Sequence, residues 1–345
     1  MRERIIGIAY NEPAPLGYAF SEASLDILAQ VEAVEEALEE LGHVSLRLPF
    51  TRDVSQFIQT VRTEGVDMIF NLCETVEEDA RFSGHPAALL ELLGTPFSGS
   101  PSIALMLTTD KFVTNRLLRA NGILTPRCAI YNEIGVDLPT GLRYPVIVKP
   151  RLEDASIGID QESIFENAKE LRRAAGRLSN RFGTLLIEEY IEGREFNVSL
   201  FGYPSARSLP IAEIDFSDFP DDLYPIVGYR AKWDTTSFEY HHTPREFHQD
   251  LPRLLLAFME RTACECFRLL MLRDYGRVDM RVDSNGRVHV LEVNANPCLS
   301  PNAGFAAAVG EAGISYSQMV GRLVSFMAQR FERHGHQASC PARQS

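Results

Sequence analysis

The sequence has no apolar run of the length that a membrane helix needs, which is about 18 residues. It also lacks a signal-peptide pattern, because MRERIIGIAY leads directly into a strand-like segment. Positive charge is scarce: 34 Lys and Arg stand against 47 Asp and Glu, which gives a net charge of −13. A surface that binds nucleic acid concentrates Lys and Arg, so the composition disfavours such a partner. We therefore expect a cytoplasmic protein that binds neither membranes nor nucleic acid, although local basic residues can still hold a small phosphate ligand.

Cysteine spacing typical of metal or redox sites is also absent. The six cysteines form no C-x-x-C motif and no cluster with histidine, so we expect reduced thiols. Cys298 is the one thiol in a candidate site, and without a nearby His in the sequence we expect it to line that site rather than to act as a nucleophile. The composition, 45% hydrophobic and 23% charged over 345 residues, is that of a globular protein with two or three domains.

Residues 1–108 alternate between strand and helix patterns. Three short apolar runs predict strands, at residues 5–10, 44–48 and 66–70. Between the first two, apolar residues at helical spacing predict a helix that ends at Gly42. This alternation predicts parallel strands with crossover helices, whose ligands lie at the carboxyl ends of the strands. Asn71 and Glu74 follow one such strand, so the segment is either part of a binding site or a plain loop.

A stretch near the C-terminal end, GRVDMRVDSNGRVHVLEVNANPC, predicts a β-hairpin. Two runs of alternating apolar residues flank Asn285-Gly286, a dipeptide that suits a two-residue type I′ turn. With these residues in the turn, Asp279 lies opposite Glu292. Residues two apart on a strand share a face, so this pair shares its face with the next pair, Arg277 and Asn294.

Two carboxylates about 5 Å apart at Cβ repel each other unless a cation lies between them. Oxygen ligands of this kind suit Mg²⁺ or Mn²⁺, which one or two carboxylates commonly hold while substrate phosphates complete the coordination. The alternative is a solvated polar strand face on which Arg277 pairs with its neighbours. The hairpin pattern alone leaves both interpretations open.

Two lysines and a loop of small residues indicate a phosphate site. Lys111 lies on the helix predicted by DKFVTNRLLRANGILTP, and Lys149 ends the buried strand of YPVIVKP. The loop at residues 154–158 follows this strand. However, a lysine at the end of an apolar strand is commonly a snorkelling surface residue, and a single glycine is a weak signal for a phosphate cradle.

The second half offers further candidates. The strand TLLIEEYI ends in Glu188 and Glu189, which are either nucleotide contacts or solvated hinge residues. Residues 217–244 predict a long loop that acts as a lid. Helical spacing predicts two more helices, at residues 254–270 beside the hairpin and at residues 317–331.

Taken in order, these segments resemble the ATP-grasp ligases, most closely the D-alanine-D-alanine ligase branch. The resemblance runs from about residue 89 to 326, through LLELLGTPFSGS, TDKFVTNRLL, YPVIVKP, LLIEEYIEGREF, YRAKW, GRVDMRVDSNGRVHVLEVNANP and AGISYSQMV. Members of this family use ATP to phosphorylate a carboxylate, and an amine then attacks the acylphosphate to give an amide. The resemblance also implies a homodimer.

The fold that the resemblance implies is α/β, with a Rossmann-like N-terminal domain followed by a two-subdomain ATP-grasp fold whose modules are α+β. We expect four segments along the chain: the Rossmann-like domain at residues 1–108, a central ATP-grasp subdomain at 109–194, a C-terminal subdomain with the metal hairpin at 195–332, and a disordered tail at 333–345.

The resemblance also implies roles for single residues. Asp279, Glu292 and Asn294 look like Mg²⁺ (or Mn²⁺) ligands, in agreement with the hairpin register. Arg277 resembles the arginine that stabilises charge on the transferring phosphoryl group and tetrahedral intermediate, and Lys232 the lid lysine that reaches the γ-phosphate. Lys111 and Lys149 match the lysines that contact the ATP phosphates, and Ser156 and Gly158 match the loop that covers them. The adenine side is matched by Glu188, Glu189 and Ile191, and the ribose carboxylate by Glu195.

The amino-acid half departs from the family pattern. The family's Glu, Ser and Tyr that hold the first amino acid and set up the nucleophile fall near Ala23, at Ala155 and at Trp233. The nearest substitutes are Glu22 or Asp26 for the Glu and Ser156 for the Ser. Trp233 either stacks on a larger substrate or packs the lid. The family glycine that closes the oxyanion hole is Cys298 here, whose backbone N–H can still serve.

We therefore expect an ATP-dependent carboxylate–amine ligase that acts on an amino-acid-like donor and acceptor other than a pair of D-alanines. Two alternatives are an authentic D-alanine-D-alanine ligase with replaced substrate residues and a non-catalytic ATP-binding regulatory protein. For the donor pocket the candidates include Asn71, Glu74 and Arg81. Asn302 and Gly304 begin a helix whose N-terminus either binds the acceptor's carboxylate or is a plain cap.

Overall fold

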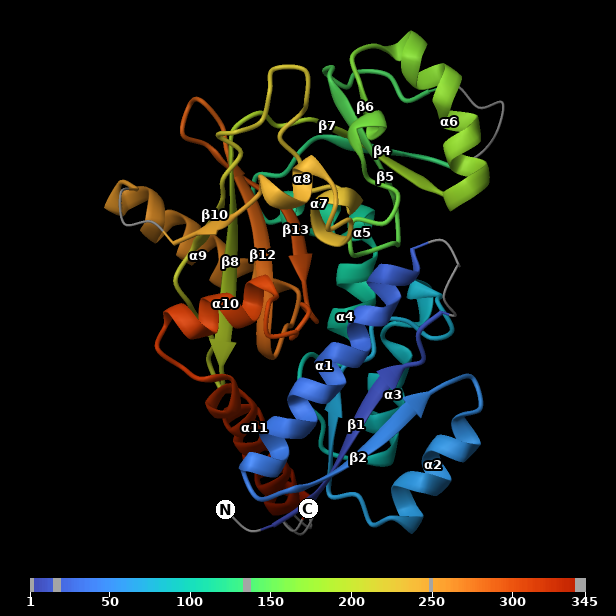
Figure 1. The fold of residues 1–345 in the computed structure, drawn as a ribbon, viewed down its shortest axis with the longest axis vertical. Helices are drawn as coiled ribbons and strands as arrows, with labels where there is room; N and C mark the ends of the chain where they lie inside the picture. The colour runs from blue at the N-terminus through green and yellow to red at the C-terminus, as the bar shows by residue number, and fades with distance from the viewer. Residues whose placement is uncertain (1–2, 15–19, 133–137, 248–250, 339–345) are drawn as a thin grey trace, which may run out of the picture.

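The computed structural model describes residues 3–14, 20–132, 138–247 and 251–338. Figure 1 shows three units: the N-terminal unit in blue to cyan, a small green unit, and a yellow-to-red unit from the second half of the chain. The architecture is α/β, as predicted. No helix of the described residues is long and apolar enough to cross a membrane.

The N-terminal unit is built on a parallel sheet of order β2-β1-β3, as the alternating pattern predicts. Its elements are β1 (Ile5–Asn11), α1 (Ser21–Glu40), β2 (Val44–Phe50), α2 (Val54–Thr63), β3 (Met68–Asn71), η1 (Ala80–Phe82), α3 (His85–Leu93) and α4 (Ser102–Thr109). The apolar face of α1, with Ile27, Val31 and Leu38, is fully buried. Because β3 ends at Asn71, the carboxyl edge of the sheet opens toward the segment that carries Glu74.

The central unit is an antiparallel sheet of order β4-β7-β5-β6 that packs against α6. Its elements are α5 (Lys111–Ala120), β4 (Cys128–Tyr131), β5 (Val146–Pro150), η2 (Gln161–Ser163), β6 (Ile164–Phe165), α6 (Ala168–Phe182) and β7 (Leu185–Glu189). Val146, Val148 and Ile187 form its core with Leu171 of α6. Lys149 and Glu188 have the opposite strand parity to these core residues, so they point away from α6.

The third unit contains a sheet of order β11-β10-β8-β12-β13, with β9 paired to β8. Its strands are β8 (Arg194–Gly202), β9 (Arg207–Ser208), β10 (Ala212–Ile214), β11 (Arg245–Glu246), β12 (Asp274–Val282) and β13 (Val288–Asn294). Its helices are α7 (Tyr229–Trp233), α8 (Phe238–His241), α9 (Arg253–Leu269), α10 (Gly304–Glu311) and α11 (Tyr316–Ala338). Val278 and Met280 belong to the core that α9 helps to form, which leaves the odd-numbered side chains of β12 on the other face.

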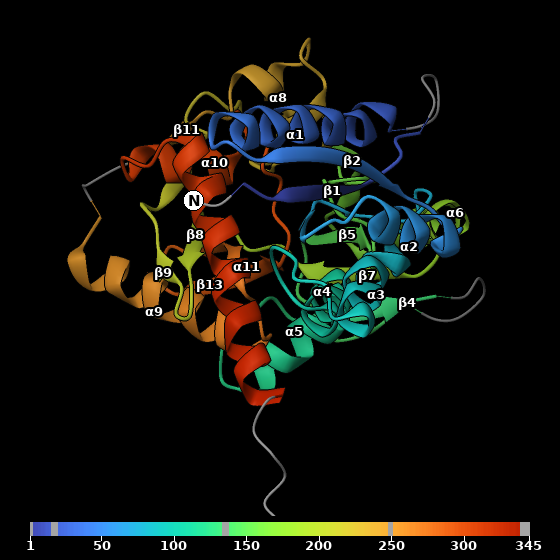
Figure 2. The same ribbon diagram turned by 90° about the horizontal axis from the view of Figure 1, so that it is seen from below.

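Helix α11 brings the C-terminal part of the chain into contact with the N-terminal unit. It packs against α1, and Met319, Val320 and Leu323 share one core with the apolar face of α1. Figure 2 shows this long helix crossing the lower face of the molecule. The tail that we predict to be disordered begins at residue 333, and α11 extends into it as far as Ala338. The rest of the tail lies outside the described residues.

The hairpin forms with a different turn from the one predicted. Ser284, Asn285 and Gly286 make a three-residue loop closed by Asp283 and Arg287, with Gly286 at φ 74°. The added loop residue shifts the register near the turn by one. A bulge at Leu291 then shifts it back, so Asp279 does pair with Glu292 and Arg277 with Asn294. The predicted pairing at the site is therefore confirmed, although the predicted turn is wrong.

The segment at residues 217–244 is not one long loop. It contains α7 and α8, two short helices of five and four residues. Helix α7 carries Lys232 and Trp233 over the central unit, where the backbone N–H of Tyr229 donates to the carbonyl of Ile159. The two short helices give the predicted lid a defined shape.

Candidate functional site

A cavity of about 920 Å³ lies where the three units meet. Glu22 and Glu74 line it from the N-terminal unit, Lys149 from the central unit, and Lys232 and Arg277 from the third unit. The residues that the sequence analysis names and that line this cavity are Glu22, Ala23, Asp26, Glu74, Lys149, Ala155, Ser156, Glu188, Glu189, Ile191, Glu195, Lys232, Trp233, Arg277, Asp279, Glu292, Asn294, Cys298, Asn302 and Gly304. Most of the candidates are therefore brought together at one site.

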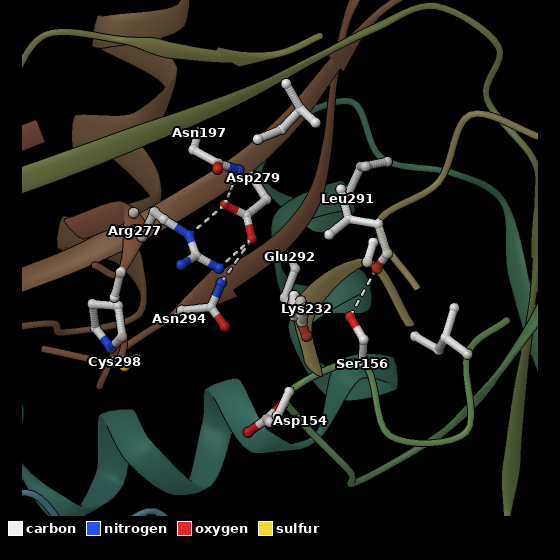
Figure 3. Close-up of a pocket in the computed structure, with 18 of the residues that line it drawn as sticks. Asp154, Ser156, Asn197, Lys232, Arg277, Asp279, Leu291, Glu292, Asn294 and Cys298 are labelled. Carbon is white, nitrogen blue, oxygen red and sulfur yellow. Dashed lines mark hydrogen bonds and ion pairs between the residues drawn. The ribbon is translucent and has the colours of Figure 1, made fainter. Parts of the chain in front are cut away.

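The floor of the cavity is the odd-numbered face of β12. Arg277 Nε and Nη2 donate to the two carboxylate oxygens of Asp279, at 2.7 and 2.9 Å. Asn197 and Asn294 donate their side-chain amides to the same carboxylate, at 2.8 and 3.0 Å. Figure 3 shows these three side chains gathered around Asp279. Burial lowers the pKa of Arg277, but Asp279 and Glu292 more than offset this effect, so the pKa is raised and the guanidinium stays charged.

Glu292 pairs with Asp279 across the hairpin, and its negative charge is neutralised by lysines. Its Oε1 lies 3.0 Å from Lys111 Nζ, and the same ammonium lies 2.6 Å from Asp154. Burial opposes ionisation of Glu292, but Lys111, Lys149 and Lys232 together hold its pKa at about 2. Glu292 is therefore ionised throughout the physiological pH range. Lys111 reaches the site through this contact rather than by lining the cavity.

These ligands fit a hard divalent cation. Asp279 and Glu292 face each other across the hairpin, and Asn294 adds an amide oxygen. Within the described residues, the buried Glu292 Oε1 has the Lys111 ammonium as its one close partner, at 3.0 Å, so it can also accept a metal cation. Among the described residues, no three His, Cys, Asp or Glu side chains form a metal-binding group. Oxygens from a bound substrate would therefore have to complete the coordination.

Glu188 and Lys149 form the wall on the central unit. Glu188, 2% exposed, forms an ion pair with Lys149 at 2.8 Å. The neighbouring Glu189 accepts from the backbone N–H of Arg143 at 2.9 Å, and this contact holds the end of β7. A buried carboxylate that shares its charge with one lysine can still accept from an exocyclic amine, which is compatible with an adenine.

The loop at residues 154–158 is shaped by backbone conformation. Ala155 and Ser156 have left-handed φ values of 54° and 60°, which cost non-glycine residues roughly 1–2 kcal/mol each. Two contacts with the lid segment hold this shape: Ser156 Oγ donates to the carbonyl of Val227 at 2.8 Å, and Trp233 Nε1 donates to that of Ala155 at 2.9 Å. Trp233 thus packs the lid, which was one of its two predicted roles.

Gly158 does not line the cavity. Its φ is +73°, and an added Cβ would lie 2.9 Å from both Phe182 and Pro150. This glycine is required for the fold of the loop, so its contribution to a phosphate site would be made through the neighbouring Ser156.

Two predicted substrate residues do not reach the cavity. Asn71 is 2% exposed and accepts from the backbone N–H of Cys73 at 3.3 Å, so it supports the turn after β3. Arg81 is largely exposed and forms an ion pair with Asp79 at 2.6 Å. The sequence placed both near the strand end correctly, but their side chains point elsewhere because local hydrogen-bond partners hold them.

Glu22 and Glu74 do lie along the cavity wall. Glu22 accepts from the hydroxyl of Tyr229 at 3.0 Å, which joins helix α1 to the lid. Glu74 accepts from Gln30 Nε2 at 3.0 Å. Burial and the nearby carboxylate of Asp26 raise the pKa of Glu74 and Gln30 lowers it, with a net pKa of about 7.

Replacing Glu74 with Gln is expected to remove a pH-dependent loss of stability. The pKa is about 7 in the folded protein against 4.5 for an ordinary Glu, so the folded state loses stability between pH 4.5 and 7 as the unfolded chain ionises first. The shift sets an upper bound of about 3 kcal/mol, and partial exposure reduces the expected loss to about 2 kcal/mol. Urea unfolding at pH 4.5 and pH 7.5 should show this loss in the wild type and not in the Glu74→Gln variant. An equal pH dependence in both proteins would refute it.

Among the residues of the cavity wall that have no role in the sequence prediction, three make polar contacts beside the predicted ones. Asn197 lies opposite Asp279 on β8, a pairing between strands 82 residues apart that no local pattern reveals. Arg281 follows Asp279 by two positions on the same strand face, so the alternation of the hairpin contained the signal. Arg245 donates to the carbonyl of Asn302 at 3.0 Å, beside the start of α10. It begins β11, directly after the segment that the sequence pattern predicted as a lid.

Comparison with known proteins supports the sequence resemblance. The family model described as D-ala D-ala ligase C-terminus matches residues 127–325. The uncharacterized protein y4sG of Sinorhizobium fredii is 32% identical over 314 residues, which cover 88% of this chain and 89% of that protein. A protein named D-alanine–D-alanine ligase from Thermotoga petrophila is 30% identical, with 84% of this chain and 88% of that one covered.

The fold also matches a solved structure. The crystal structure of D-alanine–D-alanine ligase from Bacillus anthracis complexed with ATP superposes with a TM-score of 0.74, over 96% of this chain and 100% of that chain. At 21% sequence identity this similarity concerns the fold alone.

Proposed function

Because this chain belongs to the D-alanine–D-alanine ligase family, we propose that it is an ATP-dependent ligase that joins a carboxylate to an amine. A carboxylate oxygen of the donor attacks the γ-phosphorus of ATP, and ADP leaves. The amine of the acceptor then attacks the acyl carbon, phosphate leaves, and the amine loses a proton. The observation that carries the proposal is one cavity in which Lys149, Lys232 and Arg277 face the paired carboxylates Asp279 and Glu292.

These residue types suit phosphoryl transfer, which depends on positioning and on charge neutralisation rather than on a protein nucleophile. Lys149 and Lys232 would contact the phosphates of ATP from the cavity wall, and Lys111 would reach them beside Glu292. Asp279, Glu292 and Asn294 would hold Mg²⁺ or Mn²⁺, which neutralises phosphate charge when bound. Glu188, Glu189 and Ile191 would bind the adenine and Glu195 the ribose, whereas Ser156 would cover the phosphates.

An acylphosphate reacts readily with water, so the reaction needs a closed site. The contacts of Ser156 and Trp233 hold the lid segment against the central unit. The Tyr229–Glu22 hydrogen bond holds the same lid against the N-terminal unit. We infer that these contacts exclude water while the intermediate exists.

The substrates are proposed to be an amino-acid-like donor and acceptor other than two D-alanines. Glu22 and Glu74 would face the donor's ammonium group. At the other end, Arg245 and the N-terminus of α10, with Asn302 and Gly304, would bind the acceptor's carboxylate. The replacement of the family's Ser and Tyr by Ala155 and Trp233 disfavours dialanine synthesis. A cytoplasmic homodimer with subdomain boundaries at residues 108 and 194 is part of the same proposal.

The test is release of ADP and phosphate with Mg-ATP and a panel of D- and L-amino acids and dipeptides, with mass spectrometry on every active mixture. We expect release that needs two such compounds and a product lighter by one water than their sum. D-alanyl-D-alanine from D-alanine alone would establish an authentic D-alanine–D-alanine ligase instead. ATP binding with no turnover across the panel would favour an unusual donor carboxylate first and a regulatory ATP-binding protein second.

A further inference from the structure

Arg281 is a buried cation inside the cavity that the ligase chemistry does not use. It lies on β12 two residues after Asp279, it lines the cavity, and its side chain is 3% exposed. Burial lowers its pKa, but the adjacent Glu195 more than offsets this effect, so the pKa is raised and the guanidinium is charged. A charged group held there must have partners that compensate for its desolvation.

The partners of Arg281 come from three different segments. Its Nε and Nη2 both donate to Oε2 of Glu195, at 3.0 and 2.7 Å. Its Nη1 donates to the carbonyl of Ile191 at 2.8 Å, in the hinge between the central and third units. Its Nη2 also donates to the carbonyl of Pro225, which lies within the lid segment. The guanidinium further lies 5.0 Å from the ring centre of Tyr190.

The two hydrogen bonds that Arg281 donates to Glu195 both reach the same carboxylate oxygen. Both Arg281 donors converge on Oε2, and within the described part of the chain no hydrogen bond reaches Oε1. Because a carboxylate accepts through both oxygens, Oε1 is left for a ligand in the cavity that Glu195 lines. The fixed geometry of the guanidinium also removes the rotational freedom that a carboxylate on this strand would otherwise have.

We propose that Arg281 is a positioning residue for sugar recognition: it anchors Oε2 of Glu195 so that Oε1 accepts from a ribose hydroxyl of the nucleotide. The same guanidinium holds the hinge carbonyl and the lid carbonyl, so the three segments around the nucleotide keep one relative position. The inference rests on the proposed function, because that function places ATP in the cavity.

The experiment compares the affinity of the full-length protein for Mg-ATP, Mg-2′-deoxy-ATP and Mg-3′-deoxy-ATP by calorimetric titration. Loss of a hydroxyl that donates to a charged acceptor is expected to weaken binding roughly 10- to 100-fold in the wild type. In the Arg281→Met variant we expect ATP to bind about 10-fold more weakly than in the wild type. Of the two deoxy nucleotides, we follow the one that the wild type binds more weakly, and the preference of the variant for ATP over this nucleotide should fall to about 3-fold or less. Arg281→Lys keeps the positive charge but loses the paired hydrogen bonds to Glu195, so its preference for ATP should lie between those of the wild type and Arg281→Met.

Two further variants separate positioning from general stability. Arg194→Met removes an arginine that pairs with Glu213 at 2.6 and 2.5 Å on the same sheet outside the cavity, and it should keep the wild-type preference. Adding Arg281→Met to Glu195→Gln should lower the preference no further than Glu195→Gln alone. An unchanged preference in both Arg281 variants, or equal weakening of all three nucleotides, would show a structural role only and overturn the inference. If the wild type binds no ATP, the proposed function falls and the inference with it.

Discussion

Replacing Asp279 with Asn is expected to lower turnover about 1,000-fold while the protein remains folded. The amide keeps the size of the side chain and can still accept one of the hydrogen bonds from Asn197 or Asn294. It loses the negative charge that would help hold a divalent cation on the phosphates, and loss of one such electrostatic contact typically costs 10²- to 10³-fold in rate. Arg277 retains Glu292 as a nearby negative charge, so the loss of its partner should not unfold the chain.

The measurement is ADP release at saturating substrates over a range of Mg²⁺ concentrations, with circular dichroism to confirm folding. Glu292→Gln should have a comparable effect and should raise the Mg²⁺ concentration needed for half-maximal rate. The matched control is Asp283→Asn on the same hairpin, where the carboxylate caps the turn and contacts His289 away from the cavity. Wild-type turnover in both cavity variants would refute the metal site.

The hairpin shows which structural features a local sequence pattern predicts and which it does not. Alternation and the Asn285-Gly286 dipeptide located both strands, but they could not distinguish a two-residue from a three-residue loop. The position of the bulge at Leu291 depends on packing against the rest of the sheet, and no local signal announced it. The two deviations cancel at Asp279, so the pairing of Asp279 with Glu292 was predicted correctly by a count whose two errors compensate.

Other parts of the site depend on contacts between distant segments. Asn197 reaches Asp279 only because β8 pairs with β12, and Trp233 reaches Ala155 only because the lid folds over the central unit. Such contacts follow from the tertiary fold, which the family resemblance supplied and the residue pattern did not. Arg81 shows a local limit instead, because its position near a strand end was right while its side chain pairs with Asp79 two residues away.

The shape of the lid shows a different limit. Proline and polar residues between 217 and 244 predicted an irregular loop, yet YRAKW forms a helix of five residues. An isolated helix this short is unstable in water, because nucleation costs more than a few hydrogen bonds return. Here the Trp233 and Tyr229 contacts stabilise it from outside, so its existence depends on the closed arrangement of the three units.

Replacing Arg277 with Lys is expected to lower kcat by 10²- to 10³-fold while the KM for ATP changes little. Arginine presents a planar fork that here binds both oxygens of Asp279, whereas lysine is a point charge on a flexible stem. If Arg277 stabilises charge that develops only during phosphoryl transfer and amine attack, its loss affects the transition state more than substrate binding. Retention of the positive charge keeps Asp279 neutralised, so the variant should fold.

Steady-state kinetics with each substrate varied in turn would measure this division between kcat and KM. Arg273→Lys provides the control, because Arg273 is another arginine away from solvent but contacts the carbonyl of Gly99 outside the cavity. That variant should lose stability and keep kcat, which separates a general cost of altering a buried guanidinium from the loss of a group at the reaction centre. A rise in KM with kcat unchanged in Arg277→Lys would mean that Arg277 holds the substrate in the ground state, and charge stabilisation would then have to come from Lys232.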